Sequence, residues 1–244
     1  MAAAMARGWA LAPQPPAMAF CDIDTERAEA LAAEVGGTTV EALPALRDES
    51  DVVLLAVKPA ALKEVARELD RRAPAILSVM AATTVERLNE AFPGVPTLRV
   101  MPNQPVEVGR GVLCYVLPEG MDAVLAGELV GLLDAVGGAV PVSEDRIEAA
   151  MAVMSCSPAY VALFAEALAE AGAANGLDPA LSLELVTGTL EGTAALLRKR
   201  DPVSIRANVA PPGGATEAGI DALGKNGFEE AIAAAVEASL ERFR

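Results

Sequence analysis

The sequence predicts an α/β fold, a doubly wound parallel sheet, followed by a purely helical half. Short apolar segments alternate with amphipathic helical segments as far as residue 142. The run D-V-V-L-L-A-V at 51–57 is typical of a strand that is buried on both faces. From residue 144 onward only helical patterns remain. These three observations predict a nucleotide-binding type of α/β half ahead of an all-α half.

The first half reads as strands that alternate with helices. Strands are expected at residues 17–21, 51–57, 75–80, 97–100, 112–116 and 139–142. Helices are expected at residues 1–11, 25–35, 40–49, 59–72, 84–92 and 122–136. Strands and helices at this spacing are typical of a parallel sheet with crossover helices.

The second half reads as helices alone, at residues 144–176, 179–200, 202–209, 216–224 and 227–244. The change of character falls at Ser143, so the sequence predicts two domains, residues 1–143 and 144–244. A Rossmann-like half normally opens on a strand and a G-x-G-x-x-G turn. This sequence opens instead on the helix at 1–11, so we expect a sheet that lacks its first strand.

Composition limits the possible partners. The chain has 244 residues, 53% of them hydrophobic, and a formal charge of −15. So acidic a chain repels nucleic acid and anionic membranes, and neither is expected as a partner. No apolar run is expected to reach membrane-spanning length, and no secretory signal pattern is recognised.

Two residue types narrow the chemistry. Cys21, Cys114 and Cys156 are far apart and odd in number, which predicts reduced thiols in a cytoplasmic protein and no metal site. The chain contains no histidine. Hydrolases with a Ser-His pair, His-liganded zinc sites and dehydrogenases with a histidine acid/base are therefore excluded.

The segment V-A-P-P-G-G-A-T at 209–216 predicts a tight loop that leads into a helix N-terminus. Free backbone N–H groups and the helix dipole favour an anion there. The glycines Gly213 and Gly214 allow a ligand to approach the backbone. Thr216 either caps the helix or offers its hydroxyl to a ligand.

With these segments in order, the chain resembles the pyrroline-5-carboxylate reductase family over essentially its whole length. The matching segments are M-A-A-A-M-A-R-G at 1–8, A-V-K-P at 56–59, V-M-P-N at 100–103, S-P-A-Y-V at 157–161, P-G-G-A-T at 212–216, G-F at 227–228 and the last helix. The chain differs where the family usually has other residues, at Ala82, Ser155, Ser157, Ala207 and Pro211. The resemblance implies hydride transfer from NADH or NADPH to a cyclic imino acid, which gives L-proline.

The resemblance also implies site residues. Thr216 would be catalytic, through a hydrogen bond to the ring nitrogen, and the substrate would be bound by Gly213, Gly214, Ala215, Thr216 and Asn208. The cofactor would be bound by Met1, Ala2, Asp22, Ala56, Val57, Lys58, Pro59, Ala81 and Asn103. Plainer roles stay open for Lys58 as a solvated loop lysine and for Asn103 as a turn asparagine.

Asp22 follows the strand expected at residues 17–21, which would be the second strand of a complete Rossmann-like sheet, where the adenosine ribose is recognised. A carboxylate there accepts hydrogen bonds from both ribose hydroxyls and repels a 2′-phosphate, so the sequence favours NADH over NADPH. The alternative is that Asp22 or Asp24 caps the helix at 25–35.

The apolar helix at 144–176 predicts a homodimer or a higher homo-oligomer, because an α/β half of this size cannot cover all of its surface. An intramolecular core is the alternative.

By family analogy we expect about ten further residues ahead of Met1. Two other functions stay open: a non-catalytic relative that binds a metabolite or partner because the glycine-rich turn is absent, and a 3-hydroxy acid dehydrogenase, although residues 144–176 lack the lysine that those enzymes use.

Overall fold

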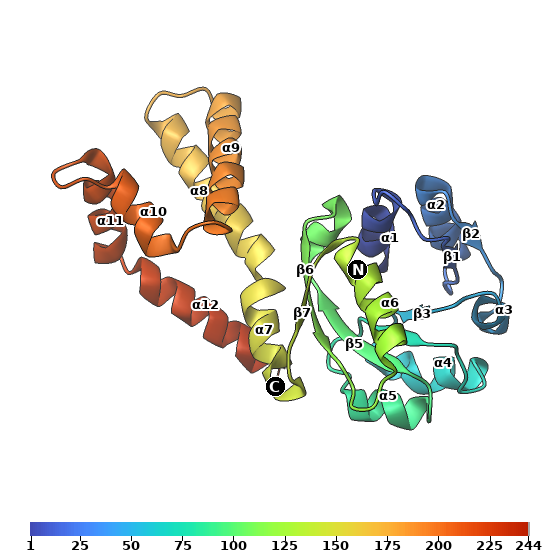
Figure 1. Cartoon of the computed structure of the whole chain (residues 1–244). Coiled ribbons are helices and arrows are strands. Elements are labelled where there is room, and N and C mark those ends of the chain that lie inside the picture. The colour runs from blue at the N-terminus through green and yellow to red at the C-terminus, as the bar shows by residue number, and fades with distance from the viewer. Residues whose placement is uncertain (244) are drawn as a thin grey trace. The chain divides into compact units, whose positions relative to one another are not determined.

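The computed structural model describes residues 1–243 (Figure 1). The backbone forms two compact units: Met1–Cys156 together with Phe243, and the helical segment 157–242. Each unit is described by itself.

The first unit contains seven strands in two sheets. The strands are β1 (Ala19–Phe20), β2 (Thr38–Thr39), β3 (Val53–Leu55), β4 (Ile76–Ser78), β5 (Thr97–Pro102), β6 (Gly111–Val116) and β7 (Gly137–Pro141). β1 pairs with β2 in parallel, and the larger sheet has the order β3-β4-β5-β6-β7. Within residues 1–243, β1 and β3 do not pair, so the sheet is interrupted between them, which agrees with a sheet that lacks a strand.

The larger sheet is not entirely parallel, in contrast to the sequence prediction. β3, β4 and β5 are parallel, but β6 runs antiparallel to β5, with Met101 opposite Cys114. The connection between β5 and β6 is only the short helix η2 (Gln104–Val108). A connection of this length cannot form the crossover that parallel strands require. β7 then pairs with β6 in parallel.

Helices cover both faces of the larger sheet, as a doubly wound fold requires. α1 (Ala2–Ala10) and α6 (Ala123–Asp134) share one core with the sheet, where Met5, Leu98 and Leu133 are fully buried. α4 (Leu62–Glu68) and α5 (Val85–Ala91) share another core with Ile76 and Phe92. The remaining helices before β4 are α2 (Thr25–Val35), α3 (Leu43–Asp48) and η1 (Pro59–Ala61).

The first unit extends past the boundary that the sequence predicts at Ser143. η3 (Glu144–Arg146) and α7 (Ile147–Met154) belong to it. Ile147 and Met151 of α7 pack with Met101 and Val116 of the sheet, which explains the shift of the boundary to Cys156. The single helix expected at 144–176 is also divided, because Pro158 cannot donate an N–H to the preceding turn.

Glu144 connects this helical segment to the sheet. One of its carboxylate oxygens accepts hydrogen bonds from the Arg99 guanidinium of β5 and, at 3.3 Å, from the amide of Val85 at the start of α5. The Arg99 side chain is 4% exposed and the Glu144 side chain 36%. The ion pair therefore holds β5, α5 and η3 together. Nothing in the sequence pattern pointed to it.

The second unit consists of five helices. They are α8 (Ser157–Ala174), α9 (Pro179–Leu197), α10 (Pro202–Val209), α11 (Ala215–Lys225) and α12 (Phe228–Phe243). α8 and α9 approach closely at Gly172, where a Cβ would lie 2.2 Å from the Ser182 hydroxyl. Tyr160 of α8 lies 2.6 Å from the hydroxyl of Ser239 in α12. Asp178 and Asp201 cap α9 and α10 through their carboxylates.

Large apolar side chains remain exposed on α8 and α9. On α8 they include Val161 at 51% and Leu163 at 64% exposed, and on α9 Leu183 at 50% and Leu185 at 53%. By length and composition, Glu144–Ala174 and Pro179–Leu197 are long and apolar enough to span a membrane. The expectation that no apolar run reaches this length was therefore wrong. An uncovered apolar surface of this kind is typical of a subunit interface.

Candidate functional site

The segments that follow β3 and β4 lie at one edge of the sheet, because these strands are parallel and adjacent. Ala56, Val57 and Lys58 follow β3 directly and are exposed, and Pro59 begins η1. Ala81 follows β4 and is exposed as well. The structure thus brings these five predicted cofactor residues to one edge, where doubly wound sheets bind nucleotides.

The loop after β4 is held in an unusual conformation. Ala82 has a φ of 53°, in the left-handed region that favours glycine. Its carbonyl accepts a hydrogen bond from Arg87 at 3.2 Å, and the buried Thr83 hydroxyl donates to the carbonyl of Ala81 at 3.2 Å. The glycine that the family usually has at this position therefore matches the backbone that this chain adopts.

Asn103 is also at the end of a strand, but its side chain is occupied. Its amide nitrogen donates to the carbonyl of Met154 at 3.0 Å, and its oxygen accepts from the amide of Val112 at 2.9 Å. The residue is 7% exposed. Its side chain therefore joins β5, β6 and α7, and this geometry favours the turn-asparagine interpretation over contact with a cofactor.

Asp22 follows β1 and is exposed. Its carboxylate accepts from the amide of Asp24 at 3.0 Å, whereas Asp24 itself caps α2 by accepting from the amide of Arg27 at 3.2 Å. The helix cap is thus Asp24, and Asp22 keeps an exposed carboxylate after the strand. Burial and the charge of Asp22 raise the pKa of the neighbouring Cys21 thiol, which favours its protonated form.

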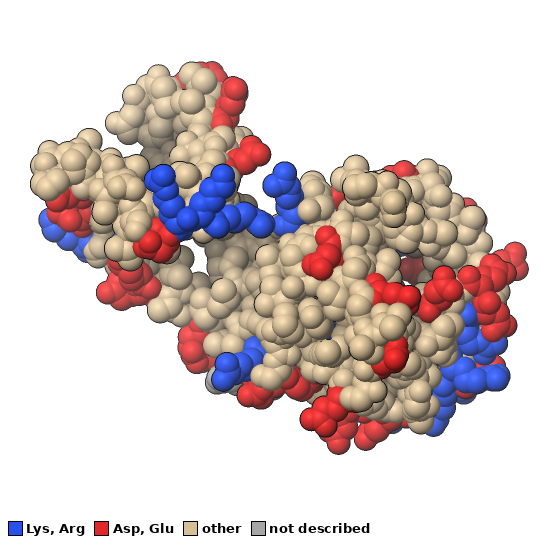
Figure 2. Space-filling model, viewed as in Figure 1, with Lys and Arg blue, Asp and Glu red and all other residues tan. Residues whose placement is uncertain are grey.

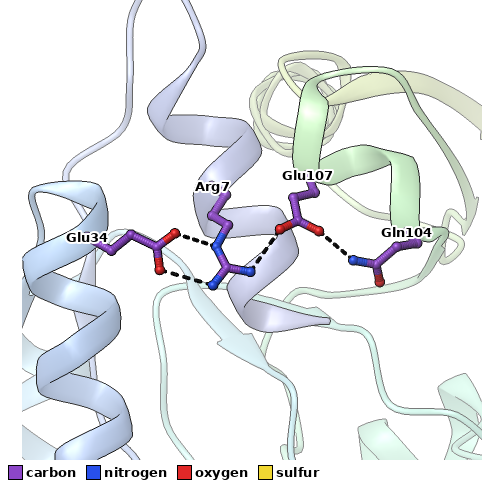
Figure 3. A network of polar contacts seen from close by, with 4 residues as sticks. All are labelled: Arg7, Glu34, Gln104 and Glu107. Carbon is purple, nitrogen blue, oxygen red and sulfur yellow. Dashed lines mark hydrogen bonds and ion pairs between the residues drawn. The ribbon is translucent and has the colours of Figure 1, made fainter. Parts of the chain in front are cut away.

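Met1 and Ala2 lie at the start of α1, and no side chain caps this end of the helix. The helix is held from the side by a polar network (Figure 3). Arg7 donates to Glu34 of α2 at 2.6 and 3.0 Å and to Glu107 of η2 at 2.9 Å. Gln104 donates to the other oxygen of Glu107 at 2.6 Å. The sequence analysis missed this network, because residues 7, 34 and 107 are far apart along the chain.

In the second unit, residues 210–214 form the tight loop that the sequence predicts before a helix. Gly213 has a φ of 74°, which requires a glycine, and the amide of Gly214 donates to the carbonyl of Pro211 at 3.0 Å. α11 begins at Ala215 with Gly214 as its N-cap. Thr216 is therefore the second helical residue and does not cap the helix, so its exposed hydroxyl is open to a ligand.

The first backbone amides of α11 can bind an anion. The N–H groups of Ala215, Thr216 and Glu217 have no acceptor within the helix, because each helix leaves its first N–H groups without one. The amide of Gly213, however, already donates to the carboxylate of Glu217 at 2.6 Å. The anion-binding donors are thus displaced along the chain from the position that the sequence predicts.

A hollow of about 270 Å³ lies between α10 and α11, next to this loop. It is lined by Val203, Arg206, Ala207, Ala210, Glu217 and Ile220. Asn208, the remaining predicted substrate residue, is exposed on α10 but does not line this hollow.

Comparison with known proteins assigns the family. A pyrroline-5-carboxylate reductase dimerisation model matches residues 144–244, and a model of NADP oxidoreductases that depend on coenzyme F420 matches residues 1–82. The pyrroline-5-carboxylate reductase of Synechocystis is 37% identical over 197 residues, which are 79% of this chain and 74% of the relative. The chain belongs to the pyrroline-5-carboxylate reductase family.

Solved structures of this family agree with the fold. The 1-pyrroline-5-carboxylate reductase of Streptococcus pyogenes is 28% identical, with a TM-score of 0.87 over 100% of this chain and 94% of that chain. The Plasmodium falciparum pyrroline carboxylate reductase with NADP bound is 26% identical, with a TM-score of 0.82 over 98% of this chain and 92% of that chain. The predicted family and fold class, a Rossmann-type sheet followed by a helical domain, are confirmed.

Proposed function

We propose that this chain reduces 1-pyrroline-5-carboxylate to L-proline by hydride transfer from a nicotinamide cofactor. Relatives named pyrroline-5-carboxylate reductase, at 31–37% identity, support this function. The observation that carries it is the start of α11, where open backbone amides and the exposed Thr216 hydroxyl lie together. A substrate with one carboxylate and one ring nitrogen presents the complementary groups.

The substrate carboxylate would be bound by the amides of Ala215 and Thr216, because anions are favoured at helix N-termini. Gly213 and Gly214 would shape the turn, and Asn208 would contribute from α10. The Thr216 hydroxyl would be the catalytic group, hydrogen-bonded to the ring nitrogen. Because a protonated imine is already electrophilic at carbon, it requires little acid catalysis, and a chain without histidine can support the reaction.

The residues of the first unit fit a dinucleotide. Ala56 and Ala81 have small side chains at the exposed carboxyl edge of the sheet, so the backbone there is open to close approach. The cofactor supplies the hydride, and Val57, Lys58 and Pro59 would contact it from the same loop. Met1 and Ala2 would contact it at the start of α1, and Asn103 would position the loop after β5. The first unit, Met1–Cys156, would thus form the cofactor domain, and the helical segment 157–242 the dimerisation and substrate domain.

For the cofactor we propose NADH over NADPH. The support is the exposed Asp22 carboxylate after β1, followed by Ile23, which is fully exposed and carries no charge that could pair with a 2′-phosphate. The solved structure of the Plasmodium falciparum relative has NADP bound, which is a finding about the cofactor of that protein. Steady-state kinetics with both cofactors test the proposal, and a higher kcat/KM with NADPH would refute it.

We propose further that the chain is a cytoplasmic homodimer or a higher homo-oligomer. The exposed apolar side chains of α8 and α9, within a segment that matches a dimerisation model, support assembly. Light scattering should give at least twice the mass of one chain. The odd number of cysteines and their wide separation along the chain support a reducing compartment.

The decisive test of the function is turnover of the purified chain with the imino acid and each cofactor. Oxidation of NADH or NADPH, with proline formed in equal amount, is the expected result. Nucleotide or proline binding without turnover would favour the non-catalytic relative instead.

A further inference from the structure

Glu217 places a negative charge at the proposed substrate site. Its Oε2 accepts a hydrogen bond from the amide of Gly213 at 2.6 Å, across the turn that precedes α11. The amide of Gly214 is engaged as well, with the carbonyl of Pro211. A side chain of the helix therefore already occupies a backbone donor of the glycine turn.

Helix capping alone explains part of this contact. Glu217 is the third residue of α11, and a glutamate at this position commonly reaches back to an amide at the start of the helix. Its charge also interacts favourably with the helix dipole. However, the open amides of Ala215 and Thr216 lie within the same turn, whose pitch is about 5.4 Å. An anion bound to them therefore lies near the Glu217 carboxylate.

The surroundings of Glu217 are open to a small ligand. The residue is half-buried, and it lines the hollow between α10 and α11 together with Arg206. The hydrogen bond to Gly213 is in an exposed setting. The carboxylate is thus at the border of this hollow, where a bound ligand would experience its charge.

We propose that Glu217 is a positioning residue that also competes, as a tethered anion, with the carboxylates of substrate and product. This inference rests on the proposed function. The Gly213 contact holds the turn in the geometry that leaves the next amides open. The charge of Glu217 repels a second carboxylate at the same helix end and attracts the positive charge of the ring nitrogen. The repulsion is the larger of the two effects, because the carboxylate would bind the backbone amides of the first turn whereas the ring nitrogen would be held by the Thr216 side chain. Glu217 thereby weakens the binding of proline and favours its release.

The variant E217Q separates the two effects, because glutamine keeps an oxygen that can accept from Gly213 but carries no charge. We expect calorimetry to show that E217Q binds L-proline about five-fold more tightly than the unchanged chain. KM for the imino acid should fall by a similar factor, while KM for the nicotinamide cofactor stays the same. The difference between the two proteins should diminish with added salt, because salt screens exposed charges.

Two further variants serve as controls. E230Q removes the same charge from the first turn of α12 and should leave proline binding unchanged. E217A removes both the charge and the acceptor, so it should bind proline more weakly than E217Q because the Gly213 turn is no longer held. Equal affinity of E217A and E217Q would refute the positioning role.

Equal or weaker proline binding by E217Q, including no measurable binding to either protein, would overturn the competing role. Failure of the proposed function has a different signature, the absence of imino acid reduction by the unchanged chain with either cofactor. The titration with proline measures the effect of Glu217 on proline binding whether or not the unchanged chain reduces the imino acid.

Discussion

Arg99 and Glu144 form an ion pair between the middle of the sheet and the helical segment that follows β7. Arg99 is almost fully buried, and its Nε has no hydrogen-bond partner among the described residues; nor has the second oxygen of Glu144. The charge of Arg99 is therefore balanced through a single contact. Removal of the acid leaves a buried guanidinium without its counter-ion.

The first prediction concerns this ion pair. E144A should lower the free energy of unfolding by about 3 kcal/mol, the lower end for loss of one partner of a buried pair, because Glu144 is partly exposed. Urea unfolding measures the change. The double variant R99M/E144A should recover most of the loss, since no buried charge remains. A double variant less stable than E144A would contradict this explanation.

The second prediction concerns the acid side of the stability profile. Hydrogen bonds from Arg7 lower the pKa of Glu34 below its usual 4.5. A lowered pKa contributes stability that is fully present above the unfolded value and is lost as the pH falls through the folded value. E34Q should therefore flatten the loss of stability below pH 4.5, as measured by thermal unfolding across pH. E29Q, on the same helix, should not change it.

The third prediction concerns the loop after β4. Because Ala82 has a φ of 53°, A82G should relieve strain and raise the stability by about 0.5–1 kcal/mol. The midpoint of thermal unfolding should rise by about 1–4 °C for a chain of this size. A81G is the matched control, since Ala81 does not have a positive φ, and this substitution should lower the midpoint. A lower midpoint for A82G would show that the left-handed conformation is not strained.

The fourth prediction concerns Thr216. If its hydroxyl binds the ring nitrogen, T216V should reduce kcat/KM about 100-fold, the usual cost of one donor aimed at the reacting atoms. T216S keeps the hydroxyl and should retain most of the activity. Since Thr216 does not cap α11, neither variant should change the thermal midpoint by more than about 1 °C. Unchanged kinetics of T216V would remove Thr216 from the catalytic site.

Much of the fold could be predicted from the sequence because periodicity records burial. The run at 51–57 contains β3, whose Val53 and Leu55 are buried, and the turn chemistry at 212–214 marks the start of α11 within one residue. The antiparallel β6 could not be predicted, because a strand has the same composition in either direction. The only sequence feature that indicated it was the small number of residues between Val100 and Val112, which are too few for a crossover helix.

The candidate site could be predicted only in part. Positions at strand ends follow from order along the chain, so Ala56, Ala81 and Asp22 lie where expected, after their strands. The partners of a side chain depend on tertiary packing. For this reason the sequence did not reveal that Asn103 is engaged by Met154 and Val112, or that Glu217 occupies the Gly213 amide.

The tight connection between β5 and β6 has a consequence for how the chain can be divided. A crossover helix would have covered the sheet at Met101 and Val116, and α7 covers them in its place. A fragment that stops at residue 143 would therefore expose the apolar side chains of Met101 and Val116 and tend to aggregate. A fragment that continues to residue 156 retains α7, which covers these side chains. A fragment designed to contain the α/β unit should therefore end after α7.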